Sequence, residues 1–297
     1  MRQEIVEIDK QLGIFRVTTL GERYYTKTIK DNPEGFSEYR FFPSSSWISG
    51  CYPKGIQYYQ WLAKHGWDEA EGLKKEAGKK GSKTHYACED LTKGNEVKID
   101  SKYLNTITEQ LEELTVEEYT NVKSFADWIA VTKPEILAIE ITGFNDKYGY
   151  AGTIDYILRI NGVVWIIDLK TSNYIWTSAE LQIASYSQLD IDYKELGITD
   201  EEWKERKLAI LQLGYPRNKN KYKFTEIENK FNLFLHAKAI WANENAKQTP
   251  KQIEYPISLK LEMDNVKVVG LEIKNNKLIE AGDIPAPPVV EPPKLTK

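Results

Sequence analysis

The sequence predicts an α/β fold in which a mixed central β-sheet is flanked by helices, with an N-terminal extension of helices and strands. β-branched and aromatic residues gather in short runs, and Asn161-Gly162 separates two of these runs as in a β-hairpin. Helix-like segments return between the runs, and one of them begins with the capping-box residues Thr177 and Glu180. The predicted strands are residues 135–142, 153–160, 163–169, 208–215 and 222–227, and the predicted helices among them are residues 177–189 and 228–245.

The segments before this sheet are expected to form smaller elements. Residues 17–20 are the best strand candidate near the start, and residues 55–66 predict a helix that a glycine closes. Residues 68–90 have a helical composition, which the glycines within residues 78–81 should interrupt. Residues 104–121 are polar and acidic with few aliphatic side chains, which predicts an exposed helix and a connection.

These patterns divide the chain into four expected parts. An extension of strands and helices packs on the core, and a small C-terminal addition precedes a disordered tail that is dense in proline. In the order extension, core, addition and tail, the parts are residues 1–80, 81–250, 251–283 and 284–297.

The composition is that of an ordinary soluble protein: 41% of the 297 residues are hydrophobic and 28% are charged. No apolar stretch is long enough to span a bilayer and the first residues lack an apolar signal region, so we expect a cytoplasmic protein without a membrane partner. The two cysteines, Cys51 and Cys88, have no metal-type partner at short spacing. This excludes a zinc ribbon or a four-cysteine iron–sulfur cluster and favours two buried free thiols.

The charge balance limits how the protein could bind nucleic acid. Forty basic and 44 acidic residues give a net charge of −4, which argues mildly against a passive nucleic-acid coat but allows an enzyme with a local basic groove. Two basic clusters exist, and for either one alone a solvated surface is the simpler interpretation. They are Lys74, Lys75, Lys79, Lys80 and Lys83, and then Arg217, Lys219, Lys221 and Lys223.

The hairpin brings two acidic residues together. A two-residue turn sets Ile160 opposite Val163, and the same register sets Asp155 opposite Asp168. Side chains that face each other in this way have Cβ atoms roughly 4.5–5.5 Å apart. Lys170 lies two residues beyond Asp168 and therefore projects from the same face.

Two facing carboxylates inside a sheet should repel each other, because both faces of this hairpin are otherwise largely apolar. Lys170 supplies one compensating charge, and a divalent cation between the carboxylates would supply the rest. Oxygen ligands suit Mg²⁺ or Mn²⁺. The alternative is a sheet edge with solvated aspartates, which the facing placement and the lysine make less attractive.

The hairpin and the helix after it carry three motifs in a fixed order. They are Gly152-x-x-Asp155, Asp168-x-Lys170 and Gln182-x-x-x-Tyr186. This order resembles the PD-(D/E)XK nuclease superfamily, and within it the RecB-type and phage exonuclease branch. The match covers residues 81–189 and is strongest over residues 149–186. The resemblance implies a restriction-endonuclease-like sheet and a metal-dependent nuclease.

The resemblance also implies roles for individual residues. Asp155 and Asp168, with the main-chain carbonyl of Leu169, would ligate Mg²⁺ or Mn²⁺. Lys170 would orient or deprotonate the attacking water and stabilise charge on the phosphate.

Other side chains would contact DNA. Gln182 and Tyr186 are one helical turn apart, so they share the face that borders the active site in the family; without the motif, Tyr186 would be taken as a core aromatic. Arg217, Lys219 and Lys221 are candidates for holding DNA phosphates.

Two further candidates lie upstream of the hairpin. Gly81-x-x-x-His85 resembles the first-helix motif of the RecB-type branch, in which the histidine completes the metal shell, although a lone histidine is more often structural. Glu140 lies in the middle of a predicted strand, where a buried acidic residue needs a metal or Lys170 as its partner. At an edge strand Glu140 would instead face water.

Three functions follow from the resemblance. The first is an exonuclease that acts on DNA ends in phage-type recombination or repair, with a recombination or single-strand-binding protein as a possible partner and with oligomerisation left open. The second is a structure-specific or restriction-like endonuclease. The third is a catalytically silent nucleic-acid-binding member of the fold, against which the intact Asp155, Asp168 and Lys170 count.

Overall fold

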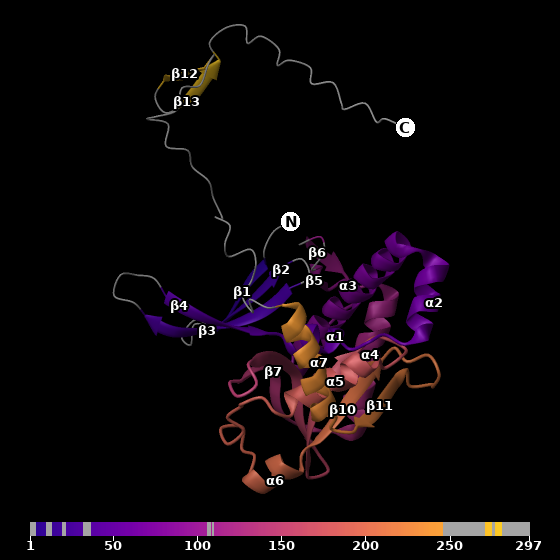
Figure 1. Ribbon diagram of the computed structural model, residues 1–297. Coiled ribbons are helices and arrows are strands. Elements are labelled where there is room, and N and C mark those ends of the chain that lie inside the picture. Colours follow the sequence, from indigo (N-terminus) through magenta and orange to yellow (C-terminus); the bar gives the residue numbers. More distant parts are fainter. Residues whose placement is uncertain are drawn as a thin grey trace. The chain divides into compact units, whose positions relative to one another are not determined.

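A five-stranded mixed sheet lies at the centre of the fold, in the strand order β11-β10-β9-β8-β7 (Figure 1). All neighbouring strands are antiparallel except β9 and β10, which are parallel. Helices flank this sheet, so the predicted fold class is confirmed. The strands are β7 (Glu135–Asn145), β8 (Tyr150–Ile160), β9 (Val163–Lys170), β10 (Lys207–Leu213) and β11 (Tyr222–Ile227).

This description comes from a computed structural model, which describes residues 4–9, 14–19, 22–31, 37–105, 108, 110–245, 271–274 and 277–280. The chain divides into two compact units, Met1–Gln252 and Ile253–Lys297. Within the second unit, β12 (Leu271–Lys274) and β13 (Lys277–Glu280) form an antiparallel hairpin. The tail expected at residues 284–297 lies outside the described residues.

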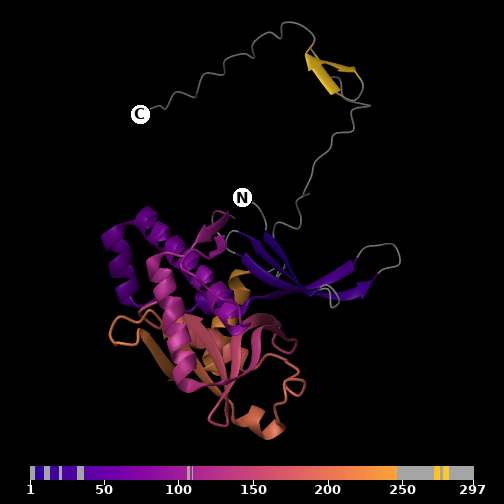
Figure 2. The same cartoon turned by 180° about the vertical axis from the view of Figure 1, so that it is seen from behind.

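Helices cover both faces of the central sheet. On one face α5 and α7 pack with α1 over a core that includes Ile157, Ile210 and Trp241. The view from behind shows α3 and α4 over the other face (Figure 2), where Phe125 and Leu211 are buried. The helices are α1 (Ser45–Gly50), α2 (Ile56–His65), α3 (Trp67–Thr92), α4 (Val116–Thr132), α5 (Thr177–Tyr186), α6 (Asp200–Glu205) and α7 (Phe231–Glu244).

The N-terminal extension begins with a four-stranded antiparallel sheet, which packs against the central sheet and precedes α1 and α2. Tyr25 and Phe42 share a small core with Phe144 of β7, and the Tyr25 hydroxyl lies 3.0 Å from Oγ1 of Thr153 on β8. The strands are β1 (Glu4–Asp9), β2 (Ile14–Thr19), β3 (Glu22–Asp31) and β4 (Ser37–Pro43).

The predicted hairpin register is confirmed. In the hairpin of β8 and β9, Ile160 pairs with Val163 next to the turn, and the pairing continues as far as Tyr156 with Ile167. Asn161 and Gly162 both have positive φ, 50° and 80°, as a two-residue turn of this kind requires. Asp155 and Asp168 therefore occupy the next facing positions.

Three sequence-based expectations about local structure were wrong. The glycines within residues 78–81 do not interrupt α3, which runs for 26 residues, because packing against α4 outweighs the weak helix propensity of glycine. In place of the exposed helix and connection expected at residues 104–121, β5 (Lys102–Asn105) and β6 (Gln110–Glu113) form a hairpin, and α4 begins only at Val116. Trp176, not Thr177, is the N-cap of α5.

The third of these errors has a clear physical cause. Thr177 is already inside the helix and provides no side-chain cap. Glu180 does not reach back to the helix start, because its carboxylate forms an ion pair with Lys230 at 2.7 Å. A tertiary contact has replaced the local one.

Two other sequence-based expectations can be compared with the structure. Cys51 and Cys88 are free thiols, and Cys88 is buried whereas Cys51 is only partly so. Within the described ranges, we find no helix with the length and apolarity needed to cross a lipid bilayer.

Candidate active site

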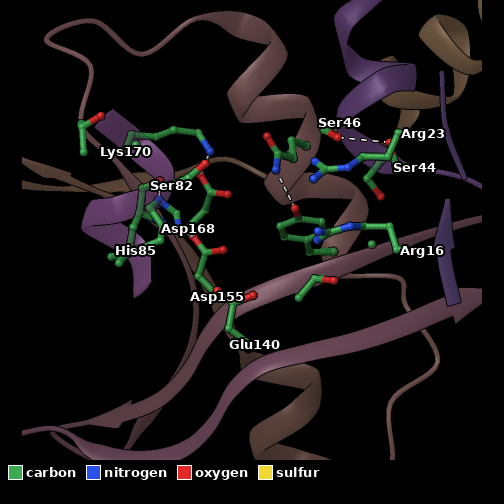
Figure 3. A pocket seen from close by; sticks show the side chains of 18 of the residues that line it. Arg16, Arg23, Ser44, Ser46, Ser82, His85, Glu140, Asp155, Asp168 and Lys170 are labelled. Atoms are coloured by element: carbon green, nitrogen blue, oxygen red, sulfur yellow. Dashed lines mark hydrogen bonds and ion pairs between the residues drawn. The ribbon is translucent and has the colours of Figure 1, made fainter. Parts of the chain in front are cut away.

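A cavity of 660 Å³ opens beside β8 and β9, between α3, α5 and the N-terminal sheet (Figure 3). Residues that the sequence motifs singled out line it, together with Glu140. They are His85, Glu140, Gly152, Asp155, Asp168, Leu169, Lys170, Gln182 and Tyr186.

Asp168 lines this cavity but has only 1% of its surface exposed. Its Oδ2 atom lies 2.6 Å from Nζ of Lys170, while Oδ1 has no hydrogen-bond partner in the described part of the chain. Burial raises the pKa of Asp168 to about 6; the charge of Lys170 opposes this shift and that of Asp155 adds to it. Burial alone would lower the pKa of Lys170, but the two aspartates raise it above its usual value. Lys170 is therefore held as a cation.

Asp155 is fixed by the neighbouring strand. Its Oδ2 atom accepts a hydrogen bond from the backbone N–H of Leu169 at 2.7 Å. This side-chain bond follows the last backbone pair of the hairpin, Tyr156 with Ile167, and it leaves the carbonyl oxygen of Leu169 for other partners. Asp155 and Leu169 thus present oxygen atoms to the same part of the cavity.

Glu140 lies opposite Asp155 on β7. The pairs on either side, Ile139 with Tyr156 and Ile141 with Ile154, set this register. Glu140 has a φ of 50°, in the left-handed region that costs a non-glycine residue of order 1–3 kcal/mol. Although solvent in the cavity reaches the side chain, partial desolvation and the charges of Asp155 and Glu89 raise its pKa to about 8.

His85 reaches the cluster from α3. Its Nδ1 atom lies 3.6 Å from Oδ2 of Asp155, and its Nε2 atom lies 3.1 Å from the carbonyl oxygen of Leu169. Atoms of His85, Glu140 and Asp155 that could bind a metal all lie within 4.8 Å of one another. The predicted metal ligand Asp168 is not in this group, in which Glu140 is the second carboxylate. The long helix α3 therefore brings a nitrogen ligand to two carboxylates that come from different strands.

The site as a whole fits a divalent cation on two grounds. Asp168 Oδ1 is a buried carboxylate oxygen with no protein donor among the described residues, and such an atom normally has a partner. The surrounding donors are carboxylates, a main-chain carbonyl and one imidazole, a set that suits Mg²⁺ or Mn²⁺ better than a soft metal.

Gln182 and Tyr186 form part of the cavity wall. Nε2 of Gln182 donates a hydrogen bond to the hydroxyl of Tyr186 at 2.6 Å. The Tyr186 ring packs so close to Gly152 that a Cβ atom there would lie 2.7 Å from Cε1 of the ring and 2.9 Å from Oγ of Ser45. The glycine of the Gly152-x-x-Asp155 motif is thus needed for close packing.

Two arginines of the N-terminal extension lie in this site, and no sequence motif predicted them. Arg16 of β2 and Arg23 of β3 lie across the cavity from the acidic cluster (Figure 3), where Ser44 and Ser46 also line the wall. The Nε atoms of both arginines are buried and have no hydrogen-bond partner within the described ranges. The cavity therefore has an acidic side and a basic side.

The basic turn between β10 and β11 does not contribute to the lining. Arg217, Lys219 and Lys221 are exposed. Because β10 runs parallel to β9 and pairs Gln212 with Lys170, the turn follows β10 at the end of the sheet where Lys170 lies.

The lysines of α3 have other partners. Lys83 is buried and lies 2.8 Å from the carboxylate of Glu118 on α4, and Lys79 lies 3.2 Å from Glu112. Lys80 lines the cavity and forms an ion pair with Glu117. These pairs tie α3 to α4 and β6, so Lys79, Lys80 and Lys83 hold the helix that carries His85 and are less available to DNA than the sequence suggested.

Comparisons with known proteins add little to this geometry. No protein family model matches the chain, and no curated protein matches it. The crystal structure of an alkaline exonuclease (LHK-Exo) from Laribacter hongkongensis aligns with 71% of this chain and 89% of its own, at 12% identity and a TM-score of 0.35. A structure of LHK-Exo in complex with dAMP aligns with 72% of this chain and 92% of its own, at 15% identity and a TM-score of 0.29.

Proposed function

We propose that this protein is a divalent-metal-dependent DNA nuclease that hydrolyses phosphodiester bonds as an exonuclease at DNA ends. The observation that carries the proposal is the buried Asp168 carboxylate, which faces Asp155, pairs with Lys170 and has one oxygen with no hydrogen-bond partner among the residues that the structure describes. A buried, half-satisfied carboxylate costs stability, and a metal site provides a functional reason for that cost.

The residues of the cluster have distinct proposed roles. Asp155, Asp168 and the carbonyl of Leu169 would hold Mg²⁺ or Mn²⁺, with His85 and Glu140 completing the ligand set. When bound, the cation would supply Lewis acidity toward the phosphate and make a water molecule more acidic. Lys170 would orient that water and stabilise negative charge on the phosphate oxygens.

The basic side of the cavity would hold the DNA strand. The guanidinium groups of Arg16 and Arg23 suit phosphate oxygens, because arginine presents several donors in a planar fork. Gln182 and Tyr186 lie on the cavity wall and would contact the same strand. The net charge of −4 makes such a local arrangement necessary for binding a polyanion.

The N-terminal sheet favours an exonuclease within this class. Arg16 and Arg23 of that sheet line the cavity on the side away from Asp155 and Asp168. A strand end would enter such a site more easily than a continuous strand would pass through it. A role in recombination or repair of phage type, with a single-strand-binding or recombination partner, would suit an enzyme of this kind.

The test compares linear DNA with covalently closed circular DNA and measures the release of acid-soluble nucleotides. We expect release from linear DNA alone, with Mg²⁺ or Mn²⁺ and not with EDTA. Ca²⁺ should not support cleavage, because its looser coordination positions water poorly. Cleavage of both forms would mean an endonuclease, and cleavage of neither would mean a binding protein. Equal rates in EDTA and Mg²⁺ would refute the metal dependence.

A further inference from the structure

A second cavity, of 270 Å³, is lined in part by the segment that connects β9 to α5 and carries two exposed aromatic rings. Tyr174 is 63% exposed and Trp176 is 42% exposed, and their ring centroids are 4.8 Å apart in an edge-to-face arrangement. The segment between α1 and α2 adds a third aromatic residue, Tyr52, and a basic residue, Lys54, to the lining. Exposed aromatic groups of this kind commonly mark binding sites.

The loop that carries these rings is anchored at several points. The buried side chain of Gln212 donates from Nε2 to the carbonyl oxygen of Ser172 at 2.8 Å. Ser172 donates from Oγ to the carbonyl oxygen of Tyr174 at 3.0 Å. Ile175, between the two aromatic residues, packs against the main core. The loop thus holds Tyr174 and Trp176 toward solvent while their neighbour is partly buried.

The same loop also lines the candidate active site. Thr171 and Ser172 line the large cavity, and Tyr174 and Trp176 line the small one. Two steps along the backbone separate Ser172 from Tyr174, so their Cα atoms are at most about 7 Å apart. One DNA strand could therefore occupy both cavities at once.

We infer that Tyr52, Tyr174 and Trp176 form a stacking site for an unpaired nucleobase of the DNA strand whose phosphodiester bond lies in the large cavity. Stacking on aromatic side chains is open to any base, since every base has a π-face. In a duplex these faces are already stacked, so the site selects single-stranded or frayed DNA. Lys54 offers a positive charge to a backbone phosphate. That the ligand is a DNA strand rests on the proposed function.

Binding measurements test this site without cleavage. Fluorescence anisotropy in Ca²⁺ would compare a labelled oligo-dT strand and a blunt duplex on the wild type, Tyr174→Ala, Trp176→Ala and Trp176→Phe. Each alanine variant should bind the single strand roughly tenfold more weakly, as expected for one lost stacking contact. Trp176→Phe keeps a ring and should retain most of the affinity, and blunt-duplex binding should not change.

Tyr59→Ala is the matched control, because Tyr59 is an aromatic residue of α2 that is 54% exposed and lies outside the lining of this cavity. It should bind like the wild type. An unchanged single-strand affinity in Trp176→Ala, or an equal loss in Tyr59→Ala, would overturn the inference.

A second measurement places an abasic site at each position of the strand in turn. At one position of the strand, removing the base should weaken binding to the wild-type protein by the same factor as Trp176→Ala weakens binding of the intact strand. The Trp176→Ala variant should then lose no further affinity when it binds the strand with that abasic site. Additive losses at every position would overturn the stacking site. If single-strand binding depends on Trp176 but Mg²⁺ supports no cleavage, the proposed nuclease function fails and the stacking site stands. If Mg²⁺ supports cleavage but single-strand binding does not depend on Trp176, the stacking site fails and the nuclease function stands.

Discussion

The Nζ atom of Lys170 lies 2.6 Å from Oδ2 of Asp168, and within the described chain no hydrogen-bond donor faces the other oxygen of that carboxylate. The pair comes from alternate positions of one strand, so β9 itself holds both groups on the same face. The Oδ1 atom of Asp168 is therefore a buried acceptor that no described residue satisfies.

Asp168→Ala and Lys170→Ala should each lower the cleavage rate by more than about a hundredfold, because each removes a group that stabilises charge at the reacting phosphate. In EDTA, Asp168→Ala should melt at or above the temperature of the wild type, because burial makes the Asp168 carboxylate costly, as its raised pKa shows, and Lys170 still has the charge of Asp155 beside it. Nuclease assays and thermal melts check both statements. Asp200→Ala, an exposed change on α6, is the control. Full activity in Asp168→Ala would show that the active site lies elsewhere.

The metal-free protein should lose stability as the pH rises from about 5 to 8.5. Burial raises the pKa of Asp168 from 3.8 to about 6, and desolvation with the charges of Asp155 and Glu89 raises that of Glu140 from 4.5 to about 8. The folded state therefore binds more protons than the unfolded state in this window, so the free energy of unfolding falls with rising pH. Melting temperatures in EDTA across this range give the measurement. Glu140→Gln should flatten the fall above pH 7, and a wild-type stability that rises across the window would contradict the assignment.

Gly152→Ala should destabilise the protein by about 1–3 kcal/mol, the usual cost of overpacking. The new methyl group would lie 2.7 Å from the Tyr186 ring and must displace it or Ser45. Gly78→Ala is the matched control, because the added Cβ meets nothing within 4 Å and alanine favours the helix α3 by about 0.5–1 kcal/mol. Urea unfolding should thus give changes of opposite sign. Equal effects at the two glycines would refute the close packing of Tyr186.

Lys83→Ala should destabilise the fold by about 3–5 kcal/mol, because it leaves the buried carboxylate of Glu118 without its charged partner. Lys123→Ala removes an exposed pair with Asp127 on α4, and should cost no more than about 1 kcal/mol. Chemical denaturation of both variants gives the comparison. A small effect of Lys83→Ala would mean that this pair does not hold α3 against α4.

The turn between β10 and β11 can be tested by replacing Arg217, Lys219 and Lys221 together with alanine. If these exposed side chains neutralise DNA phosphates, the triple variant should bind all sequences more weakly and flatten the slope of log K against log salt. Metal binding should not change. Fluorescence anisotropy in Ca²⁺ over a range of salt concentrations is the measurement. Unchanged affinity and slope would mean that the turn is only a solvated surface, and Arg16→Ala would then be the variant to examine for strand binding.

The sequence alone determined those parts of the site that depend on local geometry. A two-residue turn at Asn161-Gly162 fixes the register of β8 against β9, which sets Asp155 opposite Asp168. The two-residue period of a strand then places Lys170 beside Asp168. These relationships need only contiguous residues, so the pattern of residue types is enough to predict them.

Only the tertiary structure decided what surrounds this hairpin. Glu140 faces Asp155 because a register shift between Ile136 and Ala138 moves the rest of β7 by one residue. Arg16 reaches the cavity because the N-terminal sheet packs against β8, far away in the sequence. Packing between distant segments depends on how well their surfaces fit and on whether buried charges such as Lys83 find partners. A single sequence does not display either property, because the residues that meet are not neighbours in the chain.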